Sequence, residues 1–295
     1  MDEPILLMPD AAPAAGGALH DRLECELRGA RLSLPVMPEV ALRVRRQASD
    51  PRTGAAAIAA IIATDPGLSA RILRLSNSAL YGGLSPVRDL AQAIARLGPR
   101  MVLTVVLAAA RRDAFRSDDP GLDALLEGAW MAALHGAAAG RLLAPRLAID
   151  AEEGSLAGLL LPSGIPVLAE CVSRLVREGA IDPPSAAALR EALHALSPAA
   201  GAALLARWEM PPVVRNATEY QLTPDAAPVP ARPAAWLGAA LAAAGPGLAA
   251  GEPLDALAAW VAGVLRDGPV RWSDDELSAL LEHAADDARA LVACL

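Results

Sequence analysis

Residues 65–78, with the sequence DPGLSARILRLSNS, indicate what kind of structure this chain forms. An aspartate followed by proline is typical of a helix start, because the carboxylate caps free N–H groups and proline suits the first helical position. Leu68, Ile72 and Leu75 then recur at the spacing of one helix face. The sequence therefore predicts a helix with one buried face, which ends at Tyr81-Gly82-Gly83, where glycine permits a left-handed residue.

The same start and stop signals continue on both sides. Pro38 is placed to open a helix that Asp50-Pro51 ends, and Gly98-Pro99 separates a further helix from the apolar run Met101–Ala110, which we expect to be buried. Other helical patterns cover residues 122–143, 153–160, 166–178, 184–195, 198–208, 234–244, 253–266 and 274–293, and residues 222–233 are expected to form a surface loop. No convincing strand pattern occurs, so the predicted fold class is all-α, a compact multi-helix bundle without a significant sheet.

Composition supports that fold class. Hydrophobic residues make up 54% of the 295 residues but aromatic residues only 3%, and the excess is largely alanine. Alanine favours helices and lets them pack closely, whereas a β-sandwich would need more β-branched and aromatic residues. The apolar content also excludes a chain that is disordered throughout.

Charge is distributed unevenly along the chain. The net charge is −8, and all 26 basic residues are arginine. Residues 43–116 hold twelve arginines against four aspartates, whereas residues 251–295 hold three arginines against nine acidic residues. We expect the arginines to face acidic partners, within the chain or on another protein, rather than nucleic acid. The predicted docking surface comprises Arg43, Arg45, Arg46, Arg71 and Arg74. The pairs Arg45-Arg46 and Arg111-Arg112 are expected on exposed faces, with contact to an anionic ligand or an acidic partner as the alternative.

The cysteines and the first residues of the sequence indicate the cellular compartment of the protein. Cys25, Cys171 and Cys294 share no metal-ligand spacing and are odd in number, which is typical of reduced cytosolic thiols. The first residues lack the basic segment of a signal peptide. Residues 233–251 have no charge after Pro233, but they are mostly alanine and glycine and Gly245-Pro246-Gly247 interrupts them. We therefore expect a cytoplasmic protein without a membrane span.

An ordered set of motifs spans residues 34–107. It comprises Leu34-Pro35-x-x-Pro38-Glu39-Val40, Asp65-Pro66-x-Leu68-x-x-Arg71-x-Leu73-x-x-x-Asn77-Ser78, Tyr81-Gly82 and Ala93-Ile94-x-x-Leu97-Gly98. In order and spacing this set resembles the HDOD family, the HD-related output domain of bacterial signalling proteins. The resemblance continues less closely through Trp130, Gly158-Leu159-Leu160 and Trp208-x-x-Pro211. We expect structural roles, with ligand contact as the alternative, for the motif residues Pro35, Pro38, Asp65, Pro66, Asn77, Tyr81, Gly82, Leu97 and Gly98.

The resemblance also bears on catalysis. HD-superfamily phosphohydrolases, to which the family is related, hold metal ions with histidines, an adjacent His-Asp pair and a further aspartate. In this chain Leu161 and Pro162 fall at the positions of the His-Asp pair, and Gln221-Leu222 at a later His-His. We therefore predict no metal or catalytic site. The alternative is a metal ion held by His135 with Asp150 or Glu152, which no distinctive spacing supports.

Other enzyme signatures are also missing from the sequence. A phosphate-binding P-loop needs a lysine, which the chain lacks, and no Gly-x-Ser-x-Gly motif occurs. Cys171 lies in an apolar helical run, where we expect an inert thiol. The prediction is a protein that is not an enzyme and needs no cofactor.

The expected function is that of a bacterial regulatory scaffold that acts through protein–protein interaction, with a homo-oligomer as a further option. A module that binds a small anion such as a cyclic dinucleotide through arginine is the main alternative. Residual metal-dependent hydrolysis ranks lower because Leu161 and Pro162 fall at the positions of the His-Asp pair. DNA binding also ranks lower, because no clear basic recognition helix is found. We expect a tail over residues 1–18, an HDOD-like domain over 19–222 in two parts (to about 116 and from about 121), and C-terminal helices over 223–295 that pack on or complete that domain.

Overall fold

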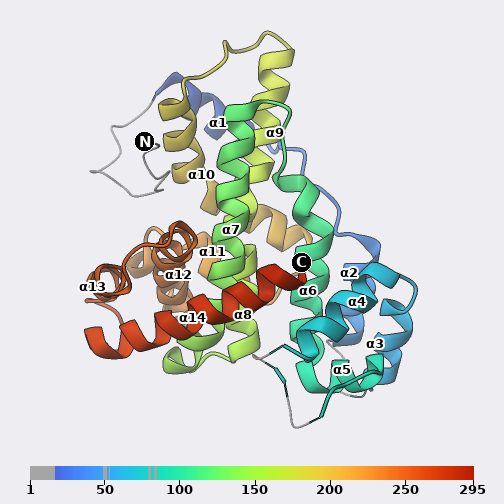
Figure 1. Ribbon diagram of the computed structural model, residues 1–295. Coiled ribbons are helices and arrows are strands. Elements are labelled where there is room, and N and C mark those ends of the chain that lie inside the picture. The colour runs from blue at the N-terminus through green and yellow to red at the C-terminus, as the bar shows by residue number, and fades with distance from the viewer. Residues whose placement is uncertain (1–16, 49–51, 53, 79–80, 83–84) are drawn as a thin grey trace.

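The computed structural model describes residues 17–48, 52, 54–78, 81–82 and 85–295, and every regular element in these residues is helical (Figure 1). The α-helices are α1 (Ala18–Arg28), α2 (Glu39–Ala48), α3 (Ala55–Ile62), α4 (Pro66–Ser76), α5 (Leu90–Leu97), α6 (Pro99–Arg111), α7 (Pro120–Leu143), α8 (Ala151–Leu160), α9 (Gly164–Arg177), α10 (Ala186–Arg207), α11 (Pro212–Glu219), α12 (Arg232–Ala250), α13 (Leu254–Val264) and α14 (Asp274–Cys294). Short 3₁₀ turns join several of them. The predicted all-α class is confirmed.

Local side-chain caps account for many of the helix starts. The Asp65 carboxylate accepts a hydrogen bond from the Leu68 N–H at 3.0 Å, and Asp89 and Asp119 cap α5 and α7 in the same way. The predicted end of α4 at Tyr81-Gly82-Gly83 is wrong, because the helix ends at Ser76 and Asn77 is its cap. Asp50-Pro51 and Gly83 lie outside the described residues.

Two predicted helix breaks are wrong, and one helix was not predicted. α10 runs unbroken through Pro198, and α12 runs through Pro246 between its two glycines. Each proline removes one backbone hydrogen bond, but burial of both halves of these helices outweighs that loss. The predicted loop over 222–233 contains two 3₁₀ turns, and α11 forms just before it.

The long helix α7 is the centre of the molecule. α8, α12 and α14 pack against it, so the C-terminal helices share a core with the preceding ones (Figure 1). α2 to α6 gather at one end, where α2 contacts α3 and α6, and α4 contacts α5. α1, α9 and α10 gather at the other end (Figure 1). α14 crosses the molecule to reach α4, and the Arg74 guanidinium donates to the Cys294 carbonyl at 3.1 Å.

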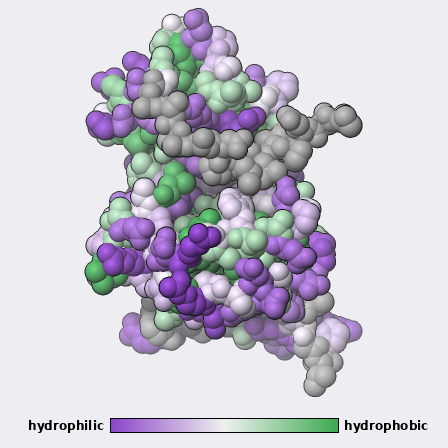
Figure 2. All heavy atoms as spheres, turned by 90° about the vertical axis from the view of Figure 1, so that its left-hand side faces the viewer, coloured by the Kyte–Doolittle hydropathy of each residue, from purple (hydrophilic) through white to green (hydrophobic). Residues whose placement is uncertain are grey.

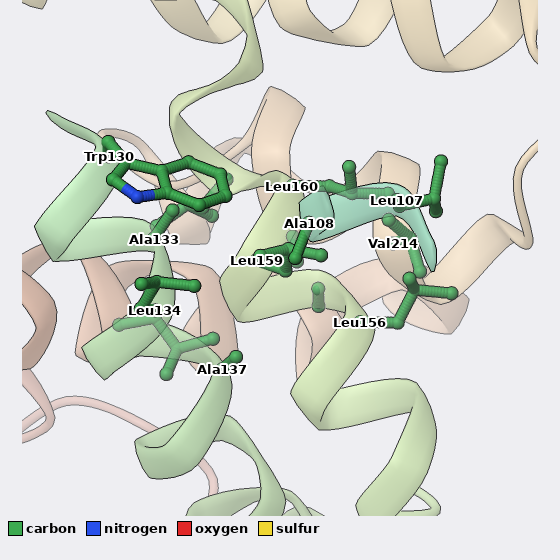
Figure 3. Packing of buried hydrophobic residues seen from close by; sticks show 14 of the residues in the cluster. Leu107, Ala108, Trp130, Ala133, Leu134, Ala137, Leu156, Leu159, Leu160 and Val214 are labelled. Carbon is green, nitrogen blue, oxygen red and sulfur yellow. The ribbon is translucent and has the colours of Figure 1, made fainter. Parts of the chain in front are cut away.

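The contact between α7 and α8 is unusually close because glycines meet there. Gly136 and Gly140 on α7 face Gly158 and Gly154 on α8, and a Cβ added to Gly158 would overlap the Gly136 carbonyl. Around this contact the core is filled by leucine, alanine and Trp130, with α6 and α11 supplying further side chains (Figure 3). The alanine-rich composition thus corresponds to helices that pack nearly backbone to backbone.

Two helical stretches, Ala151–Arg177 and Val229–Ala250, are long and apolar enough to cross a membrane by length and composition. Within the domain, 89% and 72% of their most apolar windows are buried, so packing against other helices accounts for their apolar character. The surface in Figure 2 intermixes hydrophilic and hydrophobic atoms. Among the described residues, the exposed large hydrophobic side chains are Val36, Leu222 and Val229.

Candidate functional site

The positions that match the family's metal ligands do come together in space. Leu161 and Pro162 form a 3₁₀ turn between α8 and α9. They line a small cavity of about 70 Å³ together with Gln221 and Leu222, and His194 from α10 also lines it. The helices therefore converge here as a metal site would require, although the side chains are largely apolar.

The donor atoms at this cavity do not fit a metal ion. Leu161, Pro162 and Leu222 carry no side-chain ligand atom, and the Gln221 amide already donates to the Thr218 carbonyl at 2.9 Å. Burial lowers the pKa of His194, which favours its neutral form. A single histidine does not replace the three or more ligands that catalytic metal sites use. Across the described part of the chain, no group of three His, Cys, Asp or Glu residues lies close enough to hold a metal ion.

The alternative metal ligands are held apart by other interactions. The His135 ring bonds the Met131 carbonyl at 2.9 Å, and burial lowers the pKa of this histidine. The Asp150 carboxylate caps the start of α8 and pairs with Arg100 at 3.0 Å. Glu152 accepts a hydrogen bond from the Met101 N–H at 2.8 Å, and burial raises its pKa. These three residues thus do not form a common site.

The prolines and caps of the family motifs begin helices or connect segments. The Pro35 carbonyl accepts a hydrogen bond from the Trp208 indole N–H at 2.9 Å, which joins the two ends of the resemblance. Pro38 precedes α2, and its carbonyl accepts from the Leu42 N–H. Asp65 and Pro66 begin α4.

The later motif residues hold the connection between α4 and α6. The Asn77 amide donates to the carbonyls of Leu73 and Val87, while its oxygen accepts from the Val87 N–H at 2.7 Å. Leu97 is buried, and Gly98 takes a positive φ of 80° that favours glycine.

Tyr81 and Gly82 lie in the same connection. The Tyr81 ring lies 5.4 Å from the Arg141 guanidinium, and burial raises the pKa of the Tyr81 hydroxyl. That hydroxyl is buried and has no hydrogen-bond partner among the residues that the structure describes. The Gly82 N–H donates to the Ser78 carbonyl, and a side chain at Gly82 would crowd that carbonyl. Tyr81 and Gly82 do not line the cavity at Leu161-Pro162, whereas the motif residues Pro35 and Pro38 line a second pocket.

The five arginines of the predicted docking surface have different environments. Arg45 is bound to both the carbonyl and the carboxylate of Glu209 at 2.8 Å, and Arg74 reaches the end of α14. Arg43 and Arg46 on α2 are exposed, and Arg71 on α4 is partly buried. Arg43 and Arg46 thus lie on one exposed helix face, whereas Arg45 and Arg74 form hydrogen bonds with other residues of the same chain.

A second, larger pocket contains a residue that the sequence analysis misplaced. Arg111, expected on an exposed face, is only 6% exposed and lines a pocket of about 450 Å³. Its guanidinium donates to the Ser163 hydroxyl at 2.7 Å and lies 5.0 Å from the Trp208 ring. Burial lowers the pKa of Arg111 to about 10, so it stays protonated at neutral pH. Helical spacing carried the signal, because Arg111 follows the buried Leu107 by four residues.

Comparison with known proteins agrees with this architecture. A candidate metal-dependent phosphohydrolase from Shewanella amazonensis superposes with a TM-score of 0.68 at 21% identity, over 92% of this chain and 98% of that one. An HDOD domain protein of unknown function from Geobacter sulfurreducens gives a TM-score of 0.63 at 21% identity, over 94% and 99%. A candidate signal transduction protein from Marinobacter aquaeolei gives 0.53 at 20% identity, over 90% and 66%. No curated protein sequence matches the chain.

The fold defines the class of the protein: an all-helical domain with the same fold as the Shewanella and Geobacter proteins. The sequence model of the HDOD domain matches residues 34–224, which is well over half of the chain. This chain belongs to the HDOD family, as its motifs predicted.

Proposed function

We propose that this chain is a non-catalytic signalling module that acts by binding a regulatory protein. The observation that carries the proposal is the pair Leu161-Pro162, which lines the cavity and offers no side-chain ligand atom at the positions where the motif resemblance places a His-Asp metal pair. Membership of the HDOD family and the likeness to a candidate signal transduction protein support a signalling role. The domain keeps the helical framework of a hydrolase and uses it as a binding surface.

The surface proposed for the partner is the exposed face of α2. Arg43 and Arg46 lie one turn apart there and are exposed. Neighbouring Arg45 is already held by Glu209, so it supports the turn after α10 rather than a partner. Two exposed guanidinium groups on one face suit carboxylates of an acidic protein surface.

Metal content is the first test of the non-catalytic part of the proposal. We expect protein purified without chelator to contain far less than one iron, manganese or zinc ion per chain by inductively coupled plasma mass spectrometry. We also expect no hydrolysis of bis(p-nitrophenyl) phosphate after manganese is added. A stoichiometric ion together with hydrolysis that His194→Ala abolishes would overturn the proposal.

Charge reversal on α2 tests the binding surface. The double substitution Arg43→Glu, Arg46→Glu is expected to lower recovery of the protein partner at least about tenfold, because two attractive contacts become repulsive. Recovery is measured by cross-linked co-purification from the native cells and quantitative mass spectrometry. The matched control is Arg190→Glu, Arg207→Glu, since both residues are exposed on α10. Equal recovery with both double variants would contradict this surface.

A further inference from the structure

We propose that the pocket containing Arg111 binds a small organic monocarboxylate, with the Arg111 guanidinium as its anion-binding group. The pocket lies between the 33–38 segment, the end of α6, the start of α7 and α9, with Trp208 on one wall. It is distinct from the cavity at Leu161-Pro162 and from the exposed face of α2. The inference therefore does not depend on the proposed protein partner.

The first step of the argument is that Arg111 is buried without a counter-ion. Among the described residues, its guanidinium has one polar partner, the Ser163 hydroxyl at 2.7 Å. The rings of Trp208 and Phe115 lie 5.0 and 5.5 Å from the guanidinium carbon. No carboxylate of the described chain lies within ion-pair distance of the Arg111 guanidinium. By contrast, Arg141 pairs with Asp287 at 2.7 Å and Arg174 pairs with Glu26 at 2.8 Å.

The second step is energetic. A buried charge is stable only when other groups compensate for its lost hydration, and arginine is almost never fully buried unless it is paired. Ser163, the two aromatic rings and the carbonyls at the end of α6 supply dipoles but no negative charge. A bound carboxylate would supply that charge and would accept two parallel hydrogen bonds from the planar guanidinium.

The shape of the pocket indicates the rest of the ligand. About 450 Å³ is in the usual size range of small-molecule sites. Most of the wall beside Arg111 is apolar, including Pro35, Pro166, Leu122 and Trp208. A ligand with a flat or aliphatic apolar body attached to its carboxylate would cover these side chains while its charged end meets Arg111.

The remaining charges in the wall argue for a single negative charge on the ligand. Arg116 also lines the pocket, but its guanidinium already bonds Asp123 at 2.9 Å. Asp113 lines it as well and would repel further negative charge, whereas the Glu170 carboxylate in the wall pairs with Arg177 at 3.0 Å. A cyclic dinucleotide or another polyanion therefore fits less well than a monocarboxylate.

Thermal-shift measurements and isothermal titration calorimetry with the full chain test the proposal. The probes are benzoate, indole-3-acetate and octanoate, each paired with its neutral amide, and inorganic phosphate and a cyclic dinucleotide serve as the other anions. At least one carboxylate is expected to raise the Tm by about 5 °C at about 100 times its Kd, whereas its amide does not. Failure of all three carboxylates, or equal binding of acid and amide, would overturn the proposal. So would stabilisation by phosphate or the cyclic dinucleotide alone.

Variants connect any binding to Arg111. We expect Arg111→Met to weaken the carboxylate at least about tenfold, since the charge-assisted pair is lost. Arg112→Met is the matched control, because the neighbouring arginine is 45% exposed and does not line the pocket. Arg111→Met should fold with a ligand-free Tm no lower than that of the original protein, because an uncompensated charge is removed. Should it fail to fold, Arg111→Lys keeps the charge but loses the paired donors, and unchanged affinity in that variant would overturn the assignment.

Discussion

Replacing Gly158 with alanine is expected to destabilise the protein by about 3 kcal/mol or more. The new Cβ would overlap the carbonyl of Gly136 on α7 and lie 2.7 Å from the Ala137 nitrogen. Both neighbours are backbone atoms of a central helix, so no side chain can turn aside to make room. α7 and α8 would have to separate, and the core around Trp130 would lose contacts.

Chemical denaturation followed by circular dichroism at 222 nm gives the free energy of unfolding for this test. Gly128→Ala is the matched control, because Gly128 is on the exposed face of α7, the helix that Gly158 contacts, with no atom within 4 Å of an added Cβ. That substitution should stabilise the protein by about 0.5–1 kcal/mol, because alanine restricts the unfolded chain and favours a helix. If both substitutions changed stability equally, the close contact of α7 with α8 would be wrong.

Replacing Glu26 with alanine is expected to destabilise the protein by about 3 kcal/mol, because it removes a buried charge from an ion-pair network. The Glu26 carboxylate is 2% exposed and lies 3.0 Å from Arg22 and 2.8 Å from Arg174. Arg174 belongs to α9, so this network ties the first described helix to the body of the domain. Loss of the carboxylate removes the shared partner of Arg22, Arg31 and Arg174, and only the Arg174 pair with Glu178 at 3.1 Å is kept among these contacts.

The comparison for Glu26 is a nearby pair on the same helix. Glu24 bonds Arg28 at 2.7 Å, but both side chains are at least one-third exposed, so Glu24→Ala should change stability by less than about 0.5 kcal/mol. Adding Arg174→Ala to the Glu26 variant should cost less than Arg174→Ala alone, because the two residues act in one network. Additive effects in urea denaturation would contradict the coupling.

Sequence signals predicted the helix starts well where cap and partner are neighbours in the chain. Asp65, the cap predicted from the sequence, bonds an N–H three residues ahead, so the whole interaction is present in the local sequence. The Asp89 and Ser273 caps in the structure have the same local spacing. The same local reasoning failed at Pro198 and Pro246, where it predicted breaks. Whether a proline ends a helix depends on how much surface the continued helix buries, and neighbouring residues do not contain that information.

The two candidate sites also differ in how far the local sequence could predict them. The motif resemblance placed Leu161-Pro162 and Gln221-Leu222 at the positions of metal ligands, and the structure brings these four residues to one cavity. The Arg111 pocket was missed, because an arginine pair at a helix end ordinarily faces solvent. Only its spacing from Leu107 hinted that Arg111 points inward.

By itself the sequence determined the helical class, most helix boundaries and the family, because these depend on composition, caps and motif spacing within short stretches. Only the tertiary structure decided that Gly136 meets Gly158, that Trp208 bonds Pro35, and that Arg111 is buried without a carboxylate. The first two are contacts between residues that lie far apart in the chain. The third depends on the absence of a carboxylate near the Arg111 guanidinium among the described residues. Such relations follow from how all the helices pack at once, so no local pattern encodes them.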